Sequence, residues 1–201
     1  MFATNIVYEN NIMKFSYCGK TKINDIKLSI LGEHQCENAA LALAVVENIV
    51  QIKESIVKQV LENIHWFGRM EQVQLKPLIY LDGCINEDSA KRLLPFIKKQ
   101  KQITFVLGIP ADKDYKGVLQ TVLPYAKQII SVDSANRFLH FEKDQKQQYK
   151  KICGSIPYLH FEHMDSCLTS LKDCKDTIII LGTQSIIGET KKYFQQSTLD
   201  I

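Results

Sequence analysis

Hydrophobic and polar residues follow two different rhythms along the chain, and the change falls near residue 68. Before this point, short apolar runs predict β-strands at Ile6–Tyr8, Met13–Tyr17 and Ile26–Ile30, the last with apolar residues at every second position. The pair Asn10-Asn11 between the first two strands predicts a hairpin turn. This part of the chain therefore begins with a small β region.

Two helices are predicted to follow these strands. Cys36–Val50 has apolar residues around most of its circumference, so we expect this helix to be buried on two sides. Lys53–Ile64 has its apolar residues on one face, which predicts an amphipathic helix. The segment His65–Arg69 comes next, and its Gly68 is typical of a helix stop and a hinge.

From Met70 onward, apolar strands alternate with amphipathic helices. Repeated βα units predict an α/β fold with a six-stranded, mainly parallel, doubly wound sheet and helices on both faces. The predicted strands are Glu71–Leu75, Leu78–Leu81, Ile103–Leu107, Gln128–Val132, Tyr158–Phe161 and Thr177–Leu181. The predicted helices are Asp88–Lys98, Gly117–Tyr125, Lys143–Ile152, Asp165–Leu171 and Ser185–Phe194. The change of rhythm places a domain boundary at Gly68-Arg69.

The segment Pro77–Ala90 is the first candidate site. Its apolar run ends in Asp82-Gly83 and an amphipathic helix starts a few residues later, which predicts a buried strand, a tight turn and a helix start. Asp82 is then expected at the carboxyl edge of the sheet, where open α/β sheets bind ligands. Asn86 or Asp88 can cap the helix, and an ordinary strand–loop–helix connection with a capping Asn explains the same pattern.

Two later segments repeat this arrangement. Gly108–Asp114 follows a buried strand, and a solvated loop with Asp114 near a helix N-terminus is the competing interpretation. In Gly182–Glu189, Thr183 or Ser185 is placed to cap the next helix or to bind a carboxylate, and capping alone is the simpler role.

The composition argues against several classes of protein. A net charge of +3 with scattered lysines does not indicate nucleic-acid binding, and no apolar run approaches the length of a membrane span. The six cysteines form no CxxC pair and the five histidines have no metal-ligand spacing, so no metal site is predicted. Free, mostly buried thiols and the absence of a signal peptide predict a cytoplasmic protein.

Three well-known site patterns fail on the sequence. Gly19-Lys20-Thr21 is not a phosphate loop, because Lys14 stands where that motif needs a glycine. No GxGxxG follows the first strand, which argues against a nicotinamide oxidoreductase. A Ser-His-Asp triad cannot be recognised, because triads are defined by geometry rather than by sequence order.

Five short stretches stand out from the rest of the chain: Leu31–Ala40, Trp66–Glu71, Leu81–Asn86, Gly108–Asp114 and Gly182–Glu189. Taken in this order, they resemble LxGxHQxxNAA, WPGRLE, LDGAHN, a Gly-x-x-x-Asp-Lys-Asp loop and GSLYLVGE of the folylpolyglutamate synthase/dihydrofolate synthase family, in the Mur ligase superfamily. One such match is weak, but five in order extend over most of the chain.

The resemblance implies an ATP-dependent amide ligase that phosphorylates a folate carboxylate and lets the amine of glutamate attack the acyl phosphate. It implies that residues 1–68 are the tail of a central ATPase domain and residues 69–201 a Mur ligase C-terminal Rossmann-like domain. The implied substrates are folate and glutamate, the implied cofactors are ATP and magnesium, and a monomer is expected.

The site residues implied by the resemblance are carried over position by position. Asn38, Arg69 and Asp82 match the family's ATP contacts, and their chemistry fits an amide contact, a phosphate fork and an acceptor for ribose or base. The candidates for the glutamate site are Thr183, Ser185 and Asn86.

Two departures from the family pattern change what we expect of this chain alone. Its sequence has no Gly-rich GKS loop and no magnesium-binding acidic strand. The chain is therefore expected to be the C-terminal portion of such a ligase, either as a fragment or as one half of a split enzyme with a separate N-terminal ATPase half. Ile85 replaces a histidine, and Thr183 a serine, that help hold glutamate in the family. The chain is therefore expected to be inactive by itself, and a non-catalytic nucleotide-binding Rossmann-like module is the alternative.

Overall fold

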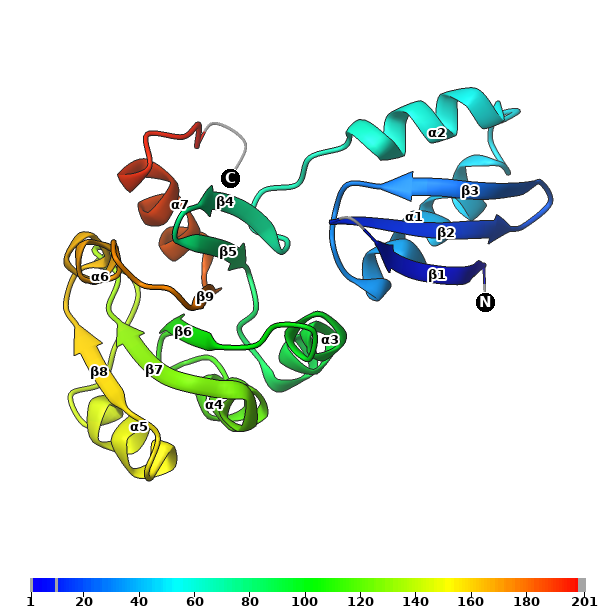
Figure 1. Ribbon diagram of the computed structural model, residues 1–201. Helices are drawn as coiled ribbons and strands as arrows, with labels where there is room; N and C mark the ends of the chain where they lie inside the picture. Colours follow the sequence, from blue (N-terminus) through cyan, green and yellow to red (C-terminus); the bar gives the residue numbers. More distant parts are fainter. Residues whose placement is uncertain (1, 10, 199–201) are drawn as a thin grey trace. The chain divides into compact units, whose positions relative to one another are not determined.

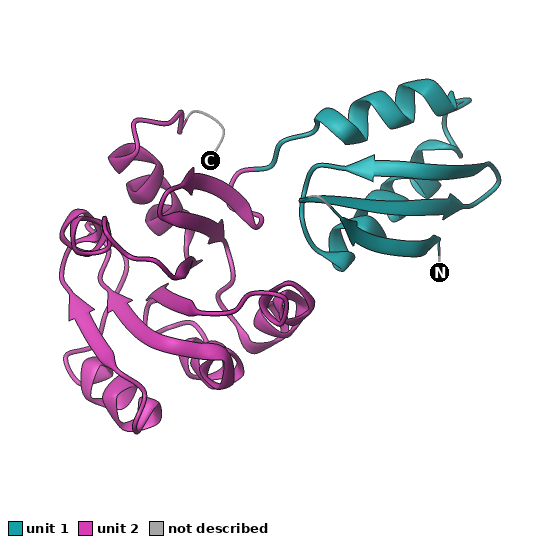
Figure 2. Cartoon of the chain, in the orientation of Figure 1, with its two compact units in different colours: residues 1–66 teal, residues 67–201 magenta. Residues whose placement is uncertain are grey.

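The computed structural model describes residues 2–9 and 11–198, and the chain forms two compact units (Figure 2). Unit 1 is Met1–Trp66 and unit 2 is Phe67–Ile201. The boundary between them lies two residues before the Gly68-Arg69 boundary that the sequence predicts. The structure does not fix the placement of one unit relative to the other.

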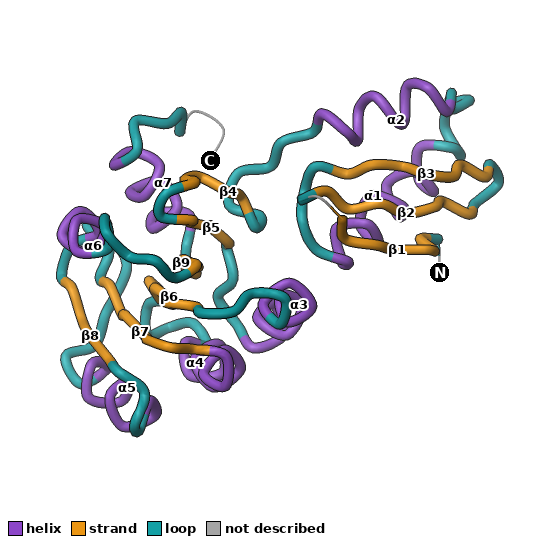
Figure 3. Tube along the Cα trace, viewed as in Figure 1, coloured by secondary structure: helices purple, strands orange, loops and turns teal. Residues whose placement is uncertain are grey.

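Unit 1 combines a three-stranded antiparallel sheet with two helices (Figures 1 and 3). Its strands β1 (Ala3–Glu9), β2 (Ile12–Cys18) and β3 (Lys22–Leu28) pair in the order β1-β2-β3, and the helices are α1 (Glu33–Val46) and α2 (Glu54–Asn63). Helix α1 packs against β1 and β2, and α2 packs against β3. The three strands and two helices predicted for this region are confirmed, although Asn10 of the predicted hairpin turn lies outside the described residues.

The expectation that the first helix is buried on two sides is wrong for the described residues. Leu41 and Val45 of α1 are exposed. Strands β1 and β2 supply apolar cover for one side of α1, and the described residues leave its second apolar side exposed. The residues of α1 that do become buried are Cys36, Ala40, Leu43 and Ala44.

The Gly19-Lys20-Thr21 segment is the turn between β2 and β3. The backbone N–H groups of Lys20 and Thr21 donate to the Glu47 carboxylate at 2.9 and 3.1 Å. These backbone donors are therefore already used within unit 1 and do not form a phosphate-binding loop. This agrees with the sequence, which lacks the first glycine of that motif.

Unit 2 is built on one six-stranded sheet. Its strands are β4 (Glu71–Leu75), β5 (Leu78–Asp82), β6 (Ile103–Gly108), β7 (Ala126–Val132), β8 (Tyr158–Phe161) and β9 (Thr177–Gly182). They lie in the order β4-β5-β9-β6-β7-β8, in which β4 is antiparallel to β5 and all other neighbours are parallel. The predicted six-stranded, mainly parallel α/β sheet is confirmed.

Helices cover both faces of this sheet, as Figure 1 shows. One face carries α3 (Glu87–Ile97), α4 (Tyr115–Val122) and α5 (Gln145–Cys153), and the other carries α6 (Met164–Ser170) and α7 (Gln184–Tyr193). On the first face the Tyr80 ring meets the Phe96 ring edge-on, with centroids 4.9 Å apart. On the second, Ile180 joins Leu168 and Ile187 in the core. Burial on both faces explains why the central strands β6 and β9 are apolar over most of their length.

The helix predicted over Gly117–Tyr125 is divided in two. The α-helix ends at Val122, and a 3₁₀ turn follows at Leu123–Tyr125. Pro124 lies in this turn and has no N–H to continue the α-helical hydrogen bonds.

The described residues agree with two compositional expectations. All six cysteines are free, and four of them, Cys36, Cys84, Cys153 and Cys167, are buried. No helix within the described residues is long and apolar enough to cross a membrane.

Candidate functional site

The carboxyl ends of β5, β9 and β6 lie side by side in unit 2. Asp82 pairs in register with Leu181, and Gly108 pairs with Gly182. Helix α7 leaves β9 toward one face of the sheet, whereas α3 and α4 leave β5 and β6 toward the other (Figure 1). Such a switch point is where open α/β sheets bind ligands, so the three candidate turns meet at the edge that the sequence predicts.

The hinge segment lies against the turn that follows β5. The Gly83 N–H donates to the Gly68 carbonyl at 2.8 Å, and the Met70 N–H donates to the Asp82 carboxylate at 2.9 Å. A Cβ added to Gly83 would lie 2.4 Å from Arg69 Nη1, so the Arg69 guanidinium occupies the space that a side chain would need. The fold therefore brings Arg69 and Asp82 together.

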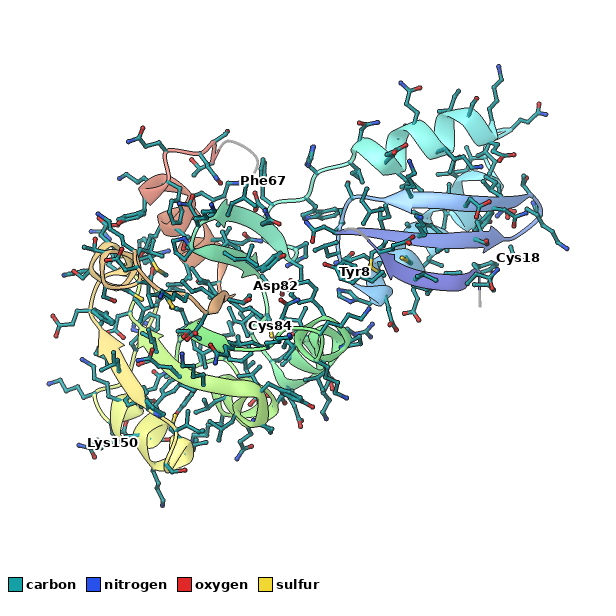
Figure 4. All side chains as sticks on the ribbon, viewed as in Figure 1. Tyr8, Cys18, Phe67, Asp82, Cys84 and Lys150 are labelled. Atoms are coloured by element: carbon teal, nitrogen blue, oxygen red, sulfur yellow. The ribbon has the colours of Figure 1, made fainter. Side chains whose placement is uncertain are left out.

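Asp82 is buried at this edge, with 6% of its surface exposed (Figure 4). Burial raises the pKa of its carboxyl group to about 6, while the Met70 N–H, the Arg69 charge and the Cys84 N–H oppose the rise. Because one oxygen already accepts from Met70, Asp82 holds the hinge in place in addition to facing the site edge.

Arg69 keeps most of its donors available. Its Nη1 lies 3.4 Å from the Gly68 carbonyl, and no carboxylate of the described part of the chain lies within ion-pair distance of the guanidinium. A planar guanidinium has five N–H donors that match phosphate oxygens. The free donors of Arg69 are therefore compatible with the phosphate role that the family resemblance implies for it.

Asn38 belongs to unit 1, in the second turn of α1. Its side chain is exposed, and its Nδ2 donates to Gln35 Oε1 at 3.2 Å. Since the placement of unit 1 relative to unit 2 is not fixed, the structure does not bring Asn38 to Arg69 and Asp82.

The three candidates for a glutamate site differ in how their polar atoms are used. Asn86 caps α3: its Oδ1 accepts from the Ser89 N–H at 2.8 Å, and its own N–H donates to Ser89 Oγ at 3.3 Å. Ser185 Oγ accepts a hydrogen bond of 2.8 Å from Asn136 Nδ2. Two of the three side chains are thus engaged within unit 2.

Thr183 is the third candidate, at the N-cap position of α7. The predicted capping by its hydroxyl is wrong, because its side chain makes no cap hydrogen bond. Its Oγ1 atom is buried and has no hydrogen-bond partner among the residues that the structure describes. Thr183 is therefore the glutamate-site candidate with an unengaged polar atom.

In the β6–α4 loop, the capping interpretation of Asp114 is confirmed. Its Oδ1 accepts from the Gly117 N–H at 2.9 Å, and its Oδ2 accepts from the Glu87 N–H at 3.0 Å. One carboxylate thus joins the N-termini of α4 and α3. The neighbouring Lys113 and Asp112 form an exposed ion pair with a distance of 2.9 Å.

A buried lysine beside the hinge is a feature that sequence reasoning missed. Lys191 of α7 is 2% exposed, its Nζ donates to Glu71 Oε1 at 2.5 Å, and it lies 3.7 Å from the centroid of the Phe67 ring. The other Glu71 oxygen accepts from the Gly68 N–H at 2.9 Å. Lys191 thus anchors the hinge to α7 (Phe67 is labelled in Figure 4). The sequence feature that could have indicated this contact is Phe67, which stands where the family pattern has proline.

A second cluster joins Ser131, His160 and Asp133 near the ends of β7 and β8. Ser131 Oγ lies 2.8 Å from His160 Nδ1 and 2.6 Å from the Tyr158 hydroxyl, whereas His160 Nε2 is 3.6 Å from Asp133 Oδ2. Burial lowers the pKa of His160. Because Ser131 is only 5% exposed, we interpret the cluster as a structural network rather than a nucleophilic site.

No group of three or more potential metal ligands occurs among residues 2–9 and 11–198. No protein-family profile matches the chain. The dihydrofolate synthase/folylpolyglutamate synthase of Bacillus subtilis is 32% identical over 191 residues, which cover 89% of this chain and 44% of that protein. The chain thus spans less than half the length of this curated relative.

Solved structures show the same fold. The Mycobacterium tuberculosis folylpolyglutamate synthase complexed with ADP superposes with a TM-score of 0.84 at 20% identity, over 97% of this chain and 48% of that chain. The Thermotoga maritima folylpolyglutamate synthase gives a TM-score of 0.78 at 22% identity, over 92% of this chain and 44% of that chain. The resemblance inferred from the five sequence stretches is therefore confirmed. In sequence and in fold, the chain is similar over most of its length to the C-terminal part of dihydrofolate synthase/folylpolyglutamate synthase.

Proposed function

We propose that this chain is the C-terminal portion of an ATP-dependent ligase that adds glutamate to folates. In the proposed reaction the γ-phosphoryl group of ATP moves to a folate carboxylate, the amine of glutamate attacks the acyl phosphate, and phosphate leaves as the amide bond forms. Residues 1–68 would be the tail of the central ATPase domain, and residues 69–201 the Rossmann-like domain. The similarity to the Bacillus subtilis protein over 89% of the chain supports this proposal.

The geometry around Arg69 is the observation that carries the proposal. Its guanidinium lies against the turn after β5, at the switch point of the sheet, and forms no ion pair within the described residues. We assign it to the phosphates of ATP, Asp82 to the ribose or base, and Asn38 of unit 1 to a further nucleotide contact. Magnesium would neutralise phosphate charge, and its ligands are expected on an N-terminal ATPase half.

The 201 residues contain no phosphate-cradling GKS loop, so we expect no turnover from the chain alone. Losing one preorganised donor typically costs several kcal/mol of transition-state stabilisation, and the whole loop is missing here. Nucleotide binding would be weak, in the range of about 1 mM, which corresponds to roughly 4 kcal/mol.

A non-catalytic nucleotide-binding module is the second candidate function. It is favoured by Ile85 in place of the family histidine, and by the internal hydrogen bonds that engage Asn86 and Ser185. This candidate predicts nucleotide binding without ligation even when an ATPase half is supplied.

Titration of ATP and ADP into the chain, followed by NMR, tests the nucleotide site. We expect weak binding by the wild type, loss of most of it in Arg69→Ala, and no change in Arg92→Ala, which removes an exposed arginine on α3. A coupled ADP-release assay with folate and glutamate should detect no turnover. Steady turnover by the pure chain would contradict the inactivity, and unchanged ATP binding by Arg69→Ala would contradict the site.

A further inference from the structure

The cluster of Ser131, His160 and Asp133 contains a polar atom that the network leaves unbonded. His160 Nδ1 lies 2.8 Å from Ser131 Oγ, whereas Nε2 of the same ring is buried and has no hydrogen-bond partner among the described residues. Asp133 Oδ2 faces this nitrogen at 3.6 Å, which is beyond the usual hydrogen-bond distance. The His160 ring therefore lies close to a carboxylate without being bonded to it.

A small cavity lies beside this pair. Ser131, Asp133 and His160 line it from β7, its end and β8, whereas Gln145 and Tyr149 line it from α5. Its volume is about 10 Å³, which suits about one water molecule and no substrate. The Asp133 side chain is 29% exposed, so protons can reach the pair from solvent. A proton is therefore the species that can change the bonding of this pair.

The pair lies at the start of a loop that is bonded to α7. Asp133 is the first residue of the β7–α5 loop, which comprises residues 133–144. The Ala135 N–H donates to Glu189 Oε1 at 3.0 Å, and Asn136 Nδ2 donates to Ser185 Oγ at 2.8 Å. A change in the bonding of Asp133 therefore acts on the segment that holds the first turns of α7.

We propose that Asp133 and His160 form a pH-sensitive switch that fastens the β7–α5 loop. A neutral imidazole has one N–H donor, whereas an imidazolium has two. Protonated His160 donates from Nδ1 to Ser131 Oγ and from Nε2 to Asp133, which brings the latter two atoms from 3.6 Å to hydrogen-bond distance. Ser131 then donates to the Tyr158 hydroxyl, 2.6 Å away. The proposal does not depend on the ligase function, because it concerns only contacts within unit 2.

The surrounding charges leave the proton to this pair. The other titratable groups that face it come from α5, β8 and the flanking loops: Glu142, Lys146, Tyr149, Tyr158, Glu162 and His163. Burial raises the pKa of both tyrosines, so their hydroxyls stay neutral. Lys146 and Glu162 lie 3.9 Å apart and shift the pKa of His160 in opposite directions. Burial lowers the pKa of His160 and raises that of Asp133, and the charge of each opposes the effect on the other.

NMR of the full 201-residue chain tests the switch. The His160 ring signals are followed from about pH 7.5 to about pH 4.5, together with exchange of the Ala135 amide, corrected for the intrinsic pH dependence of exchange. We expect His160 to take up a proton with a midpoint below the ordinary value of 6.5. Protection of the Ala135 amide should rise at least about fivefold with the same midpoint, because a hydrogen bond to a charged group then holds the loop.

Two variants separate the members of the pair. His160→Gln removes the titrating ring, and Asp133→Asn removes the charge that the ring binds, so each should limit the rise in Ala135 protection to less than about twofold. The matched control is His163→Gln, which changes an exposed histidine three positions along and should keep the wild-type rise. Unchanged amide signals of β6 and β9 show that a variant is folded, and if one variant does not fold, the other still gives the test.

Several results would overturn the proposal. A His160 ring that stays neutral over the whole pH range would exclude the switch, as would a ring that takes up a proton while Ala135 protection stays constant. A rise in protection that persists in His160→Gln, or that disappears only in His163→Gln, would assign the pH dependence of the loop to another group.

Discussion

The two units differ in how completely they bury their own apolar residues. Unit 1 has ten of the large hydrophobic side chains that are exposed among the described residues, whereas unit 2, which is about twice as long, has three. The ten are Phe2, Val7, Leu41, Val45, Val46, Ile49, Val50, Ile56, Val60 and Trp66, and the three are Leu75, Phe138 and Leu159.

The architecture explains this difference. In unit 2 a six-stranded sheet is covered by helices on both faces, so every layer has a partner. In unit 1 a three-stranded sheet packs against helices whose outer sides have no further layer. Unit 2 thus buries most of its large apolar side chains between its own layers, whereas unit 1 leaves many of them exposed.

Hydrogen exchange should reveal the largest difference between the units. We expect backbone amides of residues 1–65 to exchange faster than those of β5 and β9, by about 100-fold or more, because regions with few buried contacts open at lower free-energy cost. Mass spectrometry of exchanged peptides measures this directly. Equal protection of β2 and β9 would contradict the comparison.

Within unit 2, the backbones of β6 and β9 approach closely where Gly108 pairs with Gly182. A Cβ at Gly182 would lie 2.6 Å from the Gly108 carbonyl oxygen, whereas a Cβ at Gly188 of α7 has nothing within 4 Å. Gly182→Ala should therefore lower the free energy of unfolding of unit 2 by about 3 kcal/mol, as overpacking does.

Gly188→Ala is the control for this prediction. It should be neutral or stabilise by up to about 1 kcal/mol, since Ala favours a helix over Gly. Urea unfolding followed by circular dichroism gives both values. Equal unfolding free energies of Gly182→Ala and Gly188→Ala would mean that the backbone of β6 moves away from the new Cβ without loss of stability. That result would contradict the tight packing of β9 against β6.

The buried Lys191 tests how the hinge is attached to unit 2. Lys191→Met keeps most of the apolar stem but removes the charge that pairs with Glu71, so we expect a loss of about 2 kcal/mol in the same unfolding experiment. Lys192→Met, at the adjacent exposed position, should change stability by about 0.5 kcal/mol or less. Equal effects of the two substitutions would show that Lys191 does not anchor the hinge.

Asp82 gives the smallest expected effect, on the pH dependence of stability. Its pKa is raised to about 6 in the folded chain from an ordinary value of 3.8, so between these values the folded state keeps a proton that the unfolded state has lost. This contribution to stability is present below about pH 4 and is lost as the pH rises through about 6.

Asp82→Asn removes the titrating group and keeps an oxygen to accept from the Met70 N–H. The fall in unfolding free energy between about pH 4 and 6 should therefore be smaller in this variant than in the wild type, by about 1 kcal/mol. Asp173→Asn, at an exposed position, should keep the wild-type profile. A profile that Asp82→Asn leaves unchanged would mean that Asp82 titrates as an exposed carboxylate does.

The sequence alone determined the elements and the class of fold. Short apolar runs located all nine strands of the described residues to within a few residues, and the βα rhythm after Met70 predicted the parallel sheet. Local signals also succeeded at the helix starts of unit 2, where Asn86 and Asp114 cap α3 and α4. Strand runs and helix caps depend on residues that lie a few positions apart in the chain. The linear sequence therefore contains the information that specifies them.

Only the tertiary structure decided which surfaces and polar groups find partners. The apolar circumference of α1 predicted burial on two sides, but the number of layers in unit 1 left one side exposed. Lys191 is buried beside Glu71, 120 residues earlier in the chain, and the buried Thr183 hydroxyl makes no cap hydrogen bond and has no partner among the described residues. Pairings between residues far apart in sequence depend on the packing of whole elements, and no local pattern of side chains specifies that packing.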